Sequence, residues 1–301
     1  VGLDLAAILD RMEHILGKDY FDPDGPPLCV FRMPLHSYSK NVHTHDFHEL
    51  MVIREGKATH VLNGKEYVLL PGDVYLMRPG DEHGIMIDST EAVAEVNVLF
   101  EFDRLDLNLR DLAEVPGFHA LFSLEPAMRG ATDFKARLRL NPEELRKVLD
   151  LIDELEYEQA KEFPGHRLKS IGLFLDLIIF LSRAYTASER LKSQQVQRIG
   201  EAVSYIEANF AESITIDELT DRAHCSATQL RRIFQAAYGV SPHEYLTRTR
   251  VNRAMLMLRD SDLDITTIAH ACGYHDSSYF TRTFRKSTGL TPSAYRRRQT
   301  G

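Results

Sequence analysis

Four side chains in the N-terminal third of the chain have the types and spacing of a metal site. His43 and His45 are one residue apart, Glu49 follows shortly after, and His83 comes later. Residues two or four apart in a strand share one face, so the first three could point inward, with His83 on a neighbouring strand. Three imidazoles and a carboxylate with one open side suit a divalent transition metal such as Zn, Ni, Fe or Mn. The predicted metal ligands are therefore His43, His45, Glu49 and His83.

The same four side chains have a second interpretation as the polar lining of an effector pocket. Buried polar groups need partners, and the hydroxyls of a sugar would supply them. Metal binding and direct effector binding both stay open for this cluster. His36, His48 and His60 lack ligand spacing and are predicted to be surface or packing residues. Aromatic neighbours such as Tyr67 and Tyr75 are predicted core residues, one or two of which could stack on a sugar ring.

A second group of side chains suited to binding chemistry is predicted on two short helices near the C-terminus. A short helix with donors and acceptors on its outer face fits the DNA major groove. The alternative is the solvated face of an ordinary helical bundle, which would be preferred if only one such helix were present. The candidate DNA-contacting residues are Thr228, Gln229, Arg231 and Arg232 on the first helix, and Ser277, Ser278, Thr281 and Arg282 on the second.

These two helices belong to a unit that occurs twice, and such a repeat must be recognised before the rest of a chain is interpreted. The matching positions recur fifty residues apart: Arg232, Phe234, Gly239, Pro242 and Tyr245 return as Arg282, Phe284, Gly289, Pro292 and Tyr295. Each copy has the pattern of two short helices joined by a tight turn. The predicted caps are Thr215 with Glu218 and Ser226 with Gln229 in the first copy, and Asp264 and Asp276 in the second. Two copies with matching outer arginines favour DNA binding.

The charge distribution agrees with this prediction. The whole chain has a formal net charge of -8, whereas residues 196–301 carry a small excess of basic side chains. The excess arises from Leu230 onward, where 12 basic and 5 acidic residues lie, and it includes the run Arg296, Arg297 and Arg298. An acidic chain with a basic end is typical of a modular DNA-binding protein.

The elements that must position these residues follow from the hydrophobic period. From Leu28 to about Phe102 the period is two, with turns such as Asn63-Gly64, which predicts a small antiparallel barrel or jelly roll. Helical patterns at 142–163 and 167–185 predict an antiparallel pair that covers the barrel or forms a dimer interface. The predicted fold class is a two-domain α+β protein, with a cupin-like β-barrel and a trailing helical pair followed by an all-α domain with two helix-turn-helix motifs.

The predicted domains are an effector-binding and dimerisation domain at 1–185, a polar linker at 186–196, and a DNA-binding domain at 197–298. The N-terminal segment is charged and does not resemble a signal peptide. The longest apolar run, Ile171–Leu181, is interrupted by Asp176 and is too short to span a bilayer. Three scattered cysteines without ligand spacing are typical of a reduced, cytoplasmic protein.

The repeated unit resembles the DNA-binding domain of the AraC/XylS family of bacterial transcription regulators. The resemblance rests on the endings GVSPHEYL and GLTPSAYR and on the block IAHACGYHDSSYFTRTFRK. It implies that Glu244–Leu258 is a rigid helix joining the two units, and that the outer residues named above face the bases. It further implies a homodimer, contact with RNA polymerase, and activation of a catabolic operon. The first unit departs from the family pattern at Thr220 and His224, where a small Ala and a turn Gly are usual.

The barrel motifs resemble those of the cupin family, although Arg78 and Ile87 replace the usual Pro and Asn. In AraC-type regulators the barrel usually binds a small effector, often a sugar. The segment Gly117–Pro126 also resembles rhamnose-regulator-like members of that family, which indicates sugar metabolism. Two other functions are weighed against a regulator that is not an enzyme. One is a metal-dependent cupin enzyme with a helical tail, for which no further acid/base pair is evident; the other is a regulator that responds to the metal itself.

Overall fold

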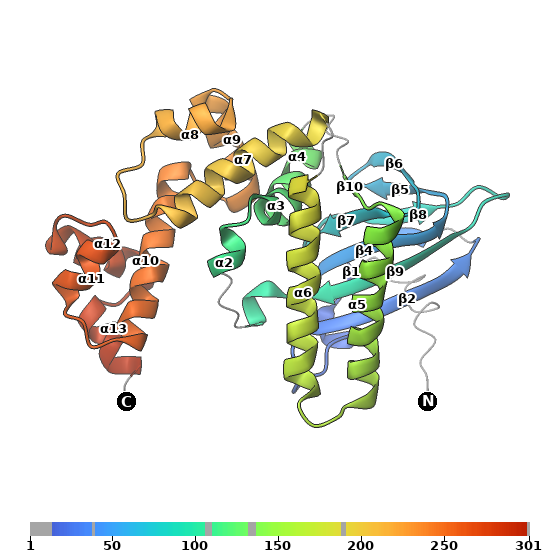
Figure 1. Ribbon diagram of the computed structural model, residues 1–301, viewed down its shortest axis with the longest axis horizontal. Helices are drawn as coiled ribbons and strands as arrows, with labels where there is room; N and C mark the ends of the chain where they lie inside the picture. Colours follow the sequence, from blue (N-terminus) through green and yellow to red (C-terminus); the bar gives the residue numbers. More distant parts are fainter. Residues whose placement is uncertain (1–13, 38–39, 106–109, 132–136, 188–190, 300–301) are drawn as a thin grey trace.

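The computed structural model describes residues 14–37, 40–105, 110–131, 137–187 and 191–299 (Figure 1). Two sheets of five strands make up the N-terminal part of the described chain. In spatial order, the first contains β1 (His14–Ile15), β3 (Lys40–His45), β8 (His83–Met86), β5 (Ala58–Leu62) and β6 (Lys65–Leu69). The second contains β10 (Leu138–Arg139), β7 (Asp73–Met77), β4 (His48–Gly56), β9 (Val93–Phe100) and β2 (Leu28–His36).

The two sheets enclose a small barrel, as the alternating pattern predicted. The β5–β6 hairpin turns at Asn63 and Gly64, whose φ angles of 49° and 73° are those of a two-residue turn with left-handed backbone. Inward residues form one buried apolar cluster: Met51, Ile53, Ala58, Leu62, Tyr67, Leu69, Tyr75, Met77, Ile85 and Val93. The intervening residues of β4, β7 and β9 point to the other face of their sheet and pack against helices.

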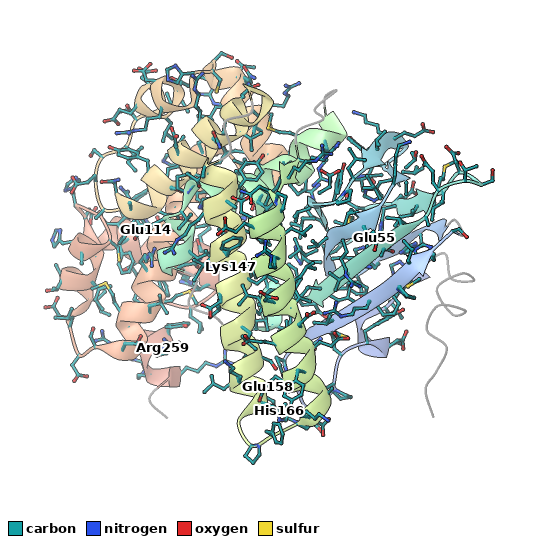
Figure 2. The ribbon with its side chains drawn as sticks, turned by 45° about the vertical axis from the view of Figure 1, so that its right-hand side comes forward. Glu55, Glu114, Lys147, Glu158, His166 and Arg259 are labelled. Atoms are coloured by element: carbon teal, nitrogen blue, oxygen red, sulfur yellow. The ribbon has the colours of Figure 1, made fainter. Side chains whose placement is uncertain are left out.

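The predicted helical pair is α5 (Pro142–Lys161) and α6 (His166–Ala187), which covers the outer face of the second sheet (Figure 1). Asn141 and Glu144 form a capping box at the start of α5. The edge strand β2 is held by α5, since the Gln159 side chain accepts from Val30 N–H and donates to the Leu28 carbonyl. Figure 2 shows Glu158 and His166 at the end where α5 and α6 join.

One described helix, α6, is long and apolar enough to cross a membrane by length and composition alone. Half of that stretch is buried inside the protein, where it packs on α5 and on α3 (Pro116–His119). Its apolar character is thus accounted for by a place in the core between the sheet and the helices that follow.

Short helical elements connect the barrel to the C-terminal part. They are η1 (Gly17–Asp19), η2 (Phe102–Arg104), α2 (Arg110–Ala113), α3, the π-helical turn η3 (Ala120–Leu124) and α4 (Glu125–Ala131). The close approach of α3 to its neighbours depends on two glycines. A Cβ on Gly117 would lie 1.9 Å from the Ser182 carbonyl oxygen, and one on Gly200 would lie 2.5 Å from that of Pro116. The segment from α3 to α4 is therefore wedged tightly between α6 and the next helix, α7.

The C-terminal part contains two helix-turn-helix units joined by a long helix, as predicted. The elements are α7 (Leu191–Ala208), α8 (Ile216–Ala223), α9 (Ala227–Tyr238), α10 (Pro242–Asp260), α11 (Ile265–Ala271), α12 (Ser277–Thr288) and α13 (Pro292–Gln299). In Figure 1, α11 to α13 form the end of the molecule furthest from the barrel. The helix expected to open at Gln197 begins at Leu191, so 191–196 of the expected linker are helical, and Thr186 and Ala187 end α6. Residues 188–190 lie outside the described part of the chain.

Candidate functional site

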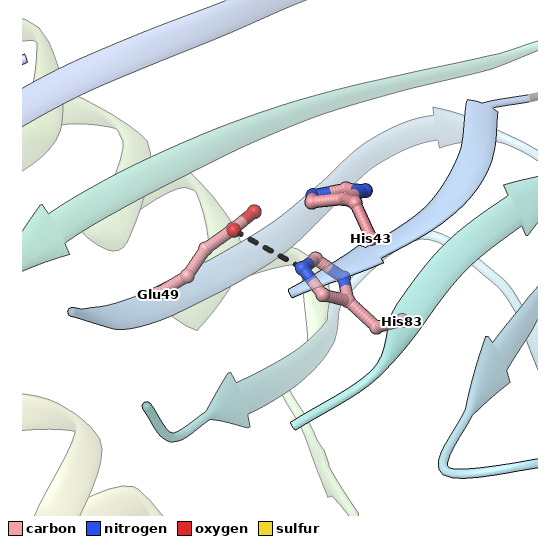
Figure 3. Close-up of side chains that lie close together, drawn as sticks. All are labelled: His43, Glu49 and His83. Carbon is pink, nitrogen blue, oxygen red and sulfur yellow. Dashed lines mark ion pairs between the residues drawn. The ribbon is translucent and has the colours of Figure 1, made fainter. Parts of the chain in front are cut away.

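The predicted metal cluster is brought together inside the barrel (Figure 3). His43 on β3 and His83 on β8 are direct partners in the antiparallel ladder, and their ring centroids are 4.4 Å apart. The Oε2 atom of Glu49 lies 3.4 Å from Nε2 of His83. All three side chains are buried, and their ligand atoms lie within 4.8 Å of one another. Two imidazoles and one carboxylate in this arrangement could hold a metal ion.

Glu49 reaches the cluster by a different route from the one the spacing suggested. The sequence allowed His43, His45 and Glu49 to share one strand face, but the chain turns between β3 and β4, so Glu49 comes from the facing sheet. Asp46 fixes this turn, because its Oδ1 accepts from the Gly17 N–H at 2.6 Å. The site therefore spans the barrel interior and ties the two sheets together.

His45 lies beside the three residues but is not part of the set within 4.8 Å. Its Nδ1 donates to the Phe47 carbonyl at 2.7 Å, and its Nε2 lies 3.5 Å from Oε2 of Glu49. Because Nδ1 carries the proton, Nε2 keeps a free lone pair, which is the tautomer that a metal ligand requires. The Nε2 atoms of His45 and His83 are buried and have no hydrogen-bond partner within the described chain. The lone pair of His45 Nε2, close to the Glu49 carboxylate, fits a cation.

The protonation states also suit metal binding. Burial alone would raise the pKa of Glu49, but His83, His45 and His43 outweigh burial and hold that pKa well below its ordinary value. Burial lowers the pKa of His45 to about 4. At neutral pH the site thus offers an ionised carboxylate and a neutral imidazole, so a metal would not have to displace protons from either group.

His60, predicted to be a surface or packing residue, lies in the interior next to this cluster. It is fully buried on β5, with its ring centroid 5.8 Å from that of His83 and 5.0 Å from that of Tyr75. Its place between inward-facing Ala58 and Leu62 in an alternating strand was the available signal. By contrast, His36 and His48 are packing residues, as predicted: His36 pairs with Glu95 at 3.2 Å, and His48 stacks on Phe100.

The first recognition helix, α9, starts where the sequence predicted. The Ser226 hydroxyl accepts from the Gln229 N–H, which makes Ser226 the N-cap. In the preceding helix, Thr215 and Glu218 form the full capping box. Leu230, Ile233 and Phe234 are buried beneath α9, whereas the predicted DNA-contacting residues lie toward solvent: Thr228, Arg231 and Arg232 are exposed and Gln229 is half-buried.

The second recognition helix, α12, has the same construction. Asp276 is its N-cap and accepts from the Ser278 N–H, while Asp264 caps α11. Of its candidate residues, Ser278 and Arg282 are exposed, and Ser277 and Thr281 are half-buried. An open groove of about 1280 Å³ runs between α10 and α12, with Arg248, Arg282 and Lys286 among its lining residues. A groove lined by cations beside an exposed helix suits a nucleic-acid backbone.

The first unit is anchored to the long helix that joins the two units. Glu207 on α7 accepts from Tyr245 and Thr249 of α10 at 2.9 and 3.0 Å, and its carboxylate also pairs with Arg253. The Arg250 guanidinium donates to the carbonyls of Phe210 and Glu212, which closes the end of α7 onto α10. Charge-assisted bonds of this kind hold the first unit and α10 in one arrangement.

The first recognition helix also contacts the effector side of the protein. His119 of α3 is buried, and its Nε2 donates to the Ala113 carbonyl at 2.7 Å. Its Nδ1 is therefore the acceptor for the Tyr238 hydroxyl of α9, at 3.2 Å. Burial lowers the pKa of His119 to about 4, which keeps the imidazole neutral for these two bonds. Next to this contact, α4 packs on α9.

Comparison with known proteins supports both halves of this description. A profile described as a helix-turn-helix domain matches residues 219–298, and one described as an AraC-like ligand binding domain matches residues 25–175. The HTH-type transcriptional activator RhaR of Escherichia coli K12 is 29% identical over 284 residues, which cover 94% of this chain and 95% of that protein. RhaR of Shigella dysenteriae is 28% identical over 286 residues, with the same two coverages.

Solved structures with similarity to this chain include isolated DNA-binding domains and one longer protein. An AraC-type regulator from Chromobacterium violaceum is 32% identical and covers 34% of this chain and 91% of its own, with a TM-score of 0.33. The DNA-binding domain of AdpA, solved with a target DNA, is 28% identical, with coverages of 34% and 91% and a TM-score of 0.33. ToxT from Vibrio cholerae is 14% identical and covers 89% of this chain and 96% of its own, also with a TM-score of 0.33.

The matched ligand-binding region spans half of the chain, and the matched helix-turn-helix region lies C-terminal to it. This family is non-enzymatic, which sets aside the alternative of a metal-dependent cupin enzyme. The duplicated, capped recognition helices and the barrel with its buried polar cluster are the two parts that such a regulator requires. The chain belongs to the AraC family of transcription regulators, with an N-terminal AraC-like ligand-binding domain and a C-terminal helix-turn-helix DNA-binding domain.

Proposed function

We propose that this protein is a cytoplasmic transcription activator that binds a sugar or sugar derivative inside the barrel and controls a catabolic operon. One observation carries the proposal: a single hydrophobic core runs from the outer face of the barrel sheet through α3 and α6 to α8 and α9. A change in the barrel can therefore reach a DNA-contacting helix through continuous packing. The name of the relative RhaR, a transcriptional activator, supports activation as the outcome.

The DNA contacts are proposed from the outer faces of α9 and α12. Arg231 and Arg232 on the first helix and Arg282 on the second are exposed and face away from their own cores. Arginine reads guanine through two parallel hydrogen bonds in the major groove. Thr228, Gln229, Ser277, Ser278 and Thr281 complete the proposed contact set. Two recognition helices on one rigid scaffold would reach major-groove faces about 34 Å apart.

The effector is proposed to act by preferring one arrangement of the two parts of the chain. An effector shifts an equilibrium only as far as its affinities for the two states differ. The contact between His119 and Tyr238 is present in the arrangement described here, and it engages the first recognition helix directly. We expect a bound effector to strengthen or release this contact and so to change how α9 meets DNA.

A metal-responsive regulator is the second candidate, supported by the orphaned Nε2 atoms of His45 and His83 beside Glu49. A divalent metal held by His43, Glu49 and His83, with His45 turning in as a fourth ligand, would supply positive charge for an effector oxygen or serve as the signal itself. The residues of this chain contribute the deprotonated donors, the closed apolar surroundings and the link between the two sheets.

We further propose a homodimer formed through α6, with a second copy of this chain as the occupant. Leu168 is 76% exposed, and a groove of about 600 Å³ runs along α6 past Gly172, Leu175 and Ile179. An exposed apolar strip on a long helix commonly marks a protein interface. Replacing Leu168 by Glu should convert the dimer to a monomer in sedimentation analysis. RNA polymerase is the partner that an activator bound next to a promoter would contact.

The function is tested by DNA binding of the full-length chain. Promoter fragments and scrambled DNA are compared in moderate salt, with and without L-arabinose, D-galactose or L-rhamnose, and with and without a chelator. We expect a preference for one promoter fragment that a sugar changes, and a sugar that changes it should also raise the melting temperature. No preference under any condition would reject the regulator, and unchanged binding in chelator would reject the metal-responsive form.

A further inference from the structure

A helix outside the barrel closes the seam between the two sheets. β6 is the edge of one sheet, and β10, beside β7, is the edge of the other. α4 covers this seam, since Lys65 on β6 donates to the Arg129 carbonyl at 3.1 Å. The Arg129 Nη2 atom donates in turn to the Leu76 carbonyl on β7 at 3.0 Å. Its guanidinium carbon lies 5.5 Å from the ring centroid of Tyr75, an inward-facing residue, so Arg129 reaches through the seam to the barrel interior.

Polar side chains continue from this arginine to the histidine cluster on one side and to α4 on the other. His60 lies between His83 and Tyr75, with ring centroids 5.8 and 5.0 Å away. On the α4 side, Oε1 of Glu125 lies 3.6 Å from Nη2 of Arg129. His60, Tyr75 and Glu125 are 0% exposed and Arg129 is 3% exposed. A buried polar path therefore joins the centre of the barrel to α4.

Most polar atoms on this path have no hydrogen-bond partner within the described chain. They are both ring nitrogens of His60, the Tyr75 hydroxyl, Nε and Nη1 of Arg129 and both carboxylate oxygens of Glu125. Buried polar groups without partners cost free energy, and a fold that keeps several together needs a reason. The Arg129–Glu125 pair does not satisfy itself, because 3.6 Å exceeds a hydrogen bond and Nη2 is already bonded to Leu76.

Glu125 lies in surroundings that solvate its carboxylate poorly. Burial outweighs the opposing effects of Arg129 and Tyr185 and raises the pKa of Glu125 to about 7. The Tyr185 hydroxyl approaches this carboxylate without a hydrogen bond of good geometry.

Building on the proposed function, we propose that His60, Tyr75, Arg129 and Glu125 form a subsite for neighbouring hydroxyl groups of a neutral, polyhydroxylated effector. One hydroxyl donates to Glu125, and an adjacent oxygen accepts from Nη1 of Arg129. His60 and Tyr75 each offer both a donor and an acceptor, which a ring of hydroxyls matches. A ligand carboxylate or phosphate would face Glu125, and a ligand cation would face Arg129, so a neutral ligand fits best.

This subsite is also the place where an effector would touch the path to DNA. Glu125 and Arg129 belong to α4, which packs directly on α9. Leu124 and Met128, from the same stretch, share a hydrophobic cluster with Leu230 and Phe234 of the first helix-turn-helix unit. Hydroxyls bound at Glu125 and Arg129 would therefore hold α4 in one position against the first recognition helix.

The test compares Tyr75→Phe, and the double variant Glu125→Leu with Arg129→Met, in the full-length chain. The double variant removes both charges, so no lone buried charge remains. The control is Tyr245→Phe, whose hydroxyl is bonded to Glu207 at 2.9 Å and should lower the melting temperature. For a ligand subsite, we expect both test variants to lose the melting-temperature rise given by L-arabinose, D-galactose or L-rhamnose. Tyr75→Phe removes a hydroxyl without a partner in the described chain, so it should melt no lower than the unaltered chain, whereas the double variant also loses the bond from Arg129 to the Leu76 carbonyl.

Each other outcome has a definite meaning. If Tyr75→Phe melts lower, as the control does, its hydroxyl is structural and the subsite is overturned. The subsite is also overturned if the variants keep the rise in melting temperature that a sugar gives. It is overturned as well if D-galacturonate, a sugar with a carboxylate, stabilises the unaltered chain and the three neutral sugars do not. The proposed regulator survives both results. If none of the sugars changes the melting temperature of the unaltered chain, an unchanged or higher melting temperature of Tyr75→Phe still supports the subsite. Its polar groups would then serve a ligand other than the sugars tested. Loss of all DNA preference in the unaltered chain would instead count against the proposed function.

Discussion

The two helix-turn-helix units have the same pattern but differ in what lies behind them. Leu230 and Phe234 of the first unit belong to the hydrophobic cluster that also contains the outer face of the barrel sheet. Phe280 and Phe284, their counterparts in the second unit, belong to a separate cluster formed with α10 and α11. The first unit is thus part of the effector-binding half in its packing, whereas the second unit has a core of its own. Figure 1 shows α11, α12 and α13 away from the barrel.

This difference gives the two units different neighbours. The first recognition helix has a hydrogen bond to the effector side through Tyr238 and packs on α4, so it can report the state of the barrel. In the second unit, α12 packs mainly against α11, α10 and α13. We infer that the second unit supplies DNA affinity that does not depend on effector, and that the first unit supplies the regulated share. A duplicated sequence therefore does not imply duplicated roles.

The largest expected effect comes from removing a core phenylalanine in each unit. Phe280→Ala and Phe234→Ala should each cost about 3–5 kcal/mol locally, since both rings are fully buried. Phe280→Ala should melt the second unit in a separate, earlier step. Phe234→Ala should destabilise the barrel together with the first unit, because they share one core. Calorimetry, with hydrogen exchange to assign each transition, checks this prediction. Identical melting profiles for the two variants would contradict the difference in packing between the two units.

The next effect concerns the exposed arginines at matched positions. Arg282→Ala should cost about 1–3 kcal/mol of DNA binding and relax the preference at one base pair. That loss should be the same with and without effector. Arg232→Ala should cost a similar amount of DNA-binding free energy in the effector state that binds DNA more tightly, and less in the other state. Titrations on a promoter fragment and its single-base variants decide the matter, and equal effector dependence of both losses would contradict the division of roles.

The contact between His119 and Tyr238 predicts a pH dependence of intermediate size. The pKa of His119 is lowered to about 4 in the folded protein, against an ordinary value near 6.5, so the unfolded chain binds the extra proton first as pH falls. Stability that rests on neutral His119 is complete above about pH 6.5 and is lost progressively toward pH 4. At pH 5 the loss should be roughly 2 kcal/mol. Urea unfolding at pH 7 and pH 5 measures it, and His119→Gln should flatten the difference; an unchanged difference would refute this assignment.

Local signals explain why much of the architecture could be predicted from the sequence. N-caps such as Thr215 and Asp276 mark helix starts, because a side chain and a nearby N–H must meet within one turn. The Asn63-Gly64 hairpin and the alternation of the strands are equally local. Matching the two copies of the repeated unit then gave both recognition helices and their exposed faces.

Contacts between distant segments could not be predicted in this way. Alternation shows which residues share a face but not which sheet a strand joins, so the arrival of Glu49 from the facing sheet was missed. His60 lacked ligand spacing, and its place next to the cluster comes from the β5–β8 pairing that brings it close to His83. The hydrogen bond between His119 and Tyr238 joins residues 119 positions apart, and no sequence pattern near either residue predicts it.

The smallest predicted effect tests the turn that distinguishes the two units. His224 ends α8 with a left-handed φ of 47°, and its counterpart Gly273 has a φ of 78°. A residue with a Cβ pays a penalty in this region that glycine does not, so His224→Gly should stabilise the first unit by about 0.5–1 kcal/mol. Gly273→Ala should instead destabilise the second, because its Cβ would lie 2.5 Å from the Ala211 carbonyl oxygen. Thermal unfolding of both variants measures the two changes. If His224→Gly also tightens DNA binding without effector, the strained turn contributes to the lower DNA affinity of the first unit in the absence of effector. If DNA binding is unchanged, the strain is local to α8, and the effector-dependent part of the DNA affinity lies in the contacts of α9 alone.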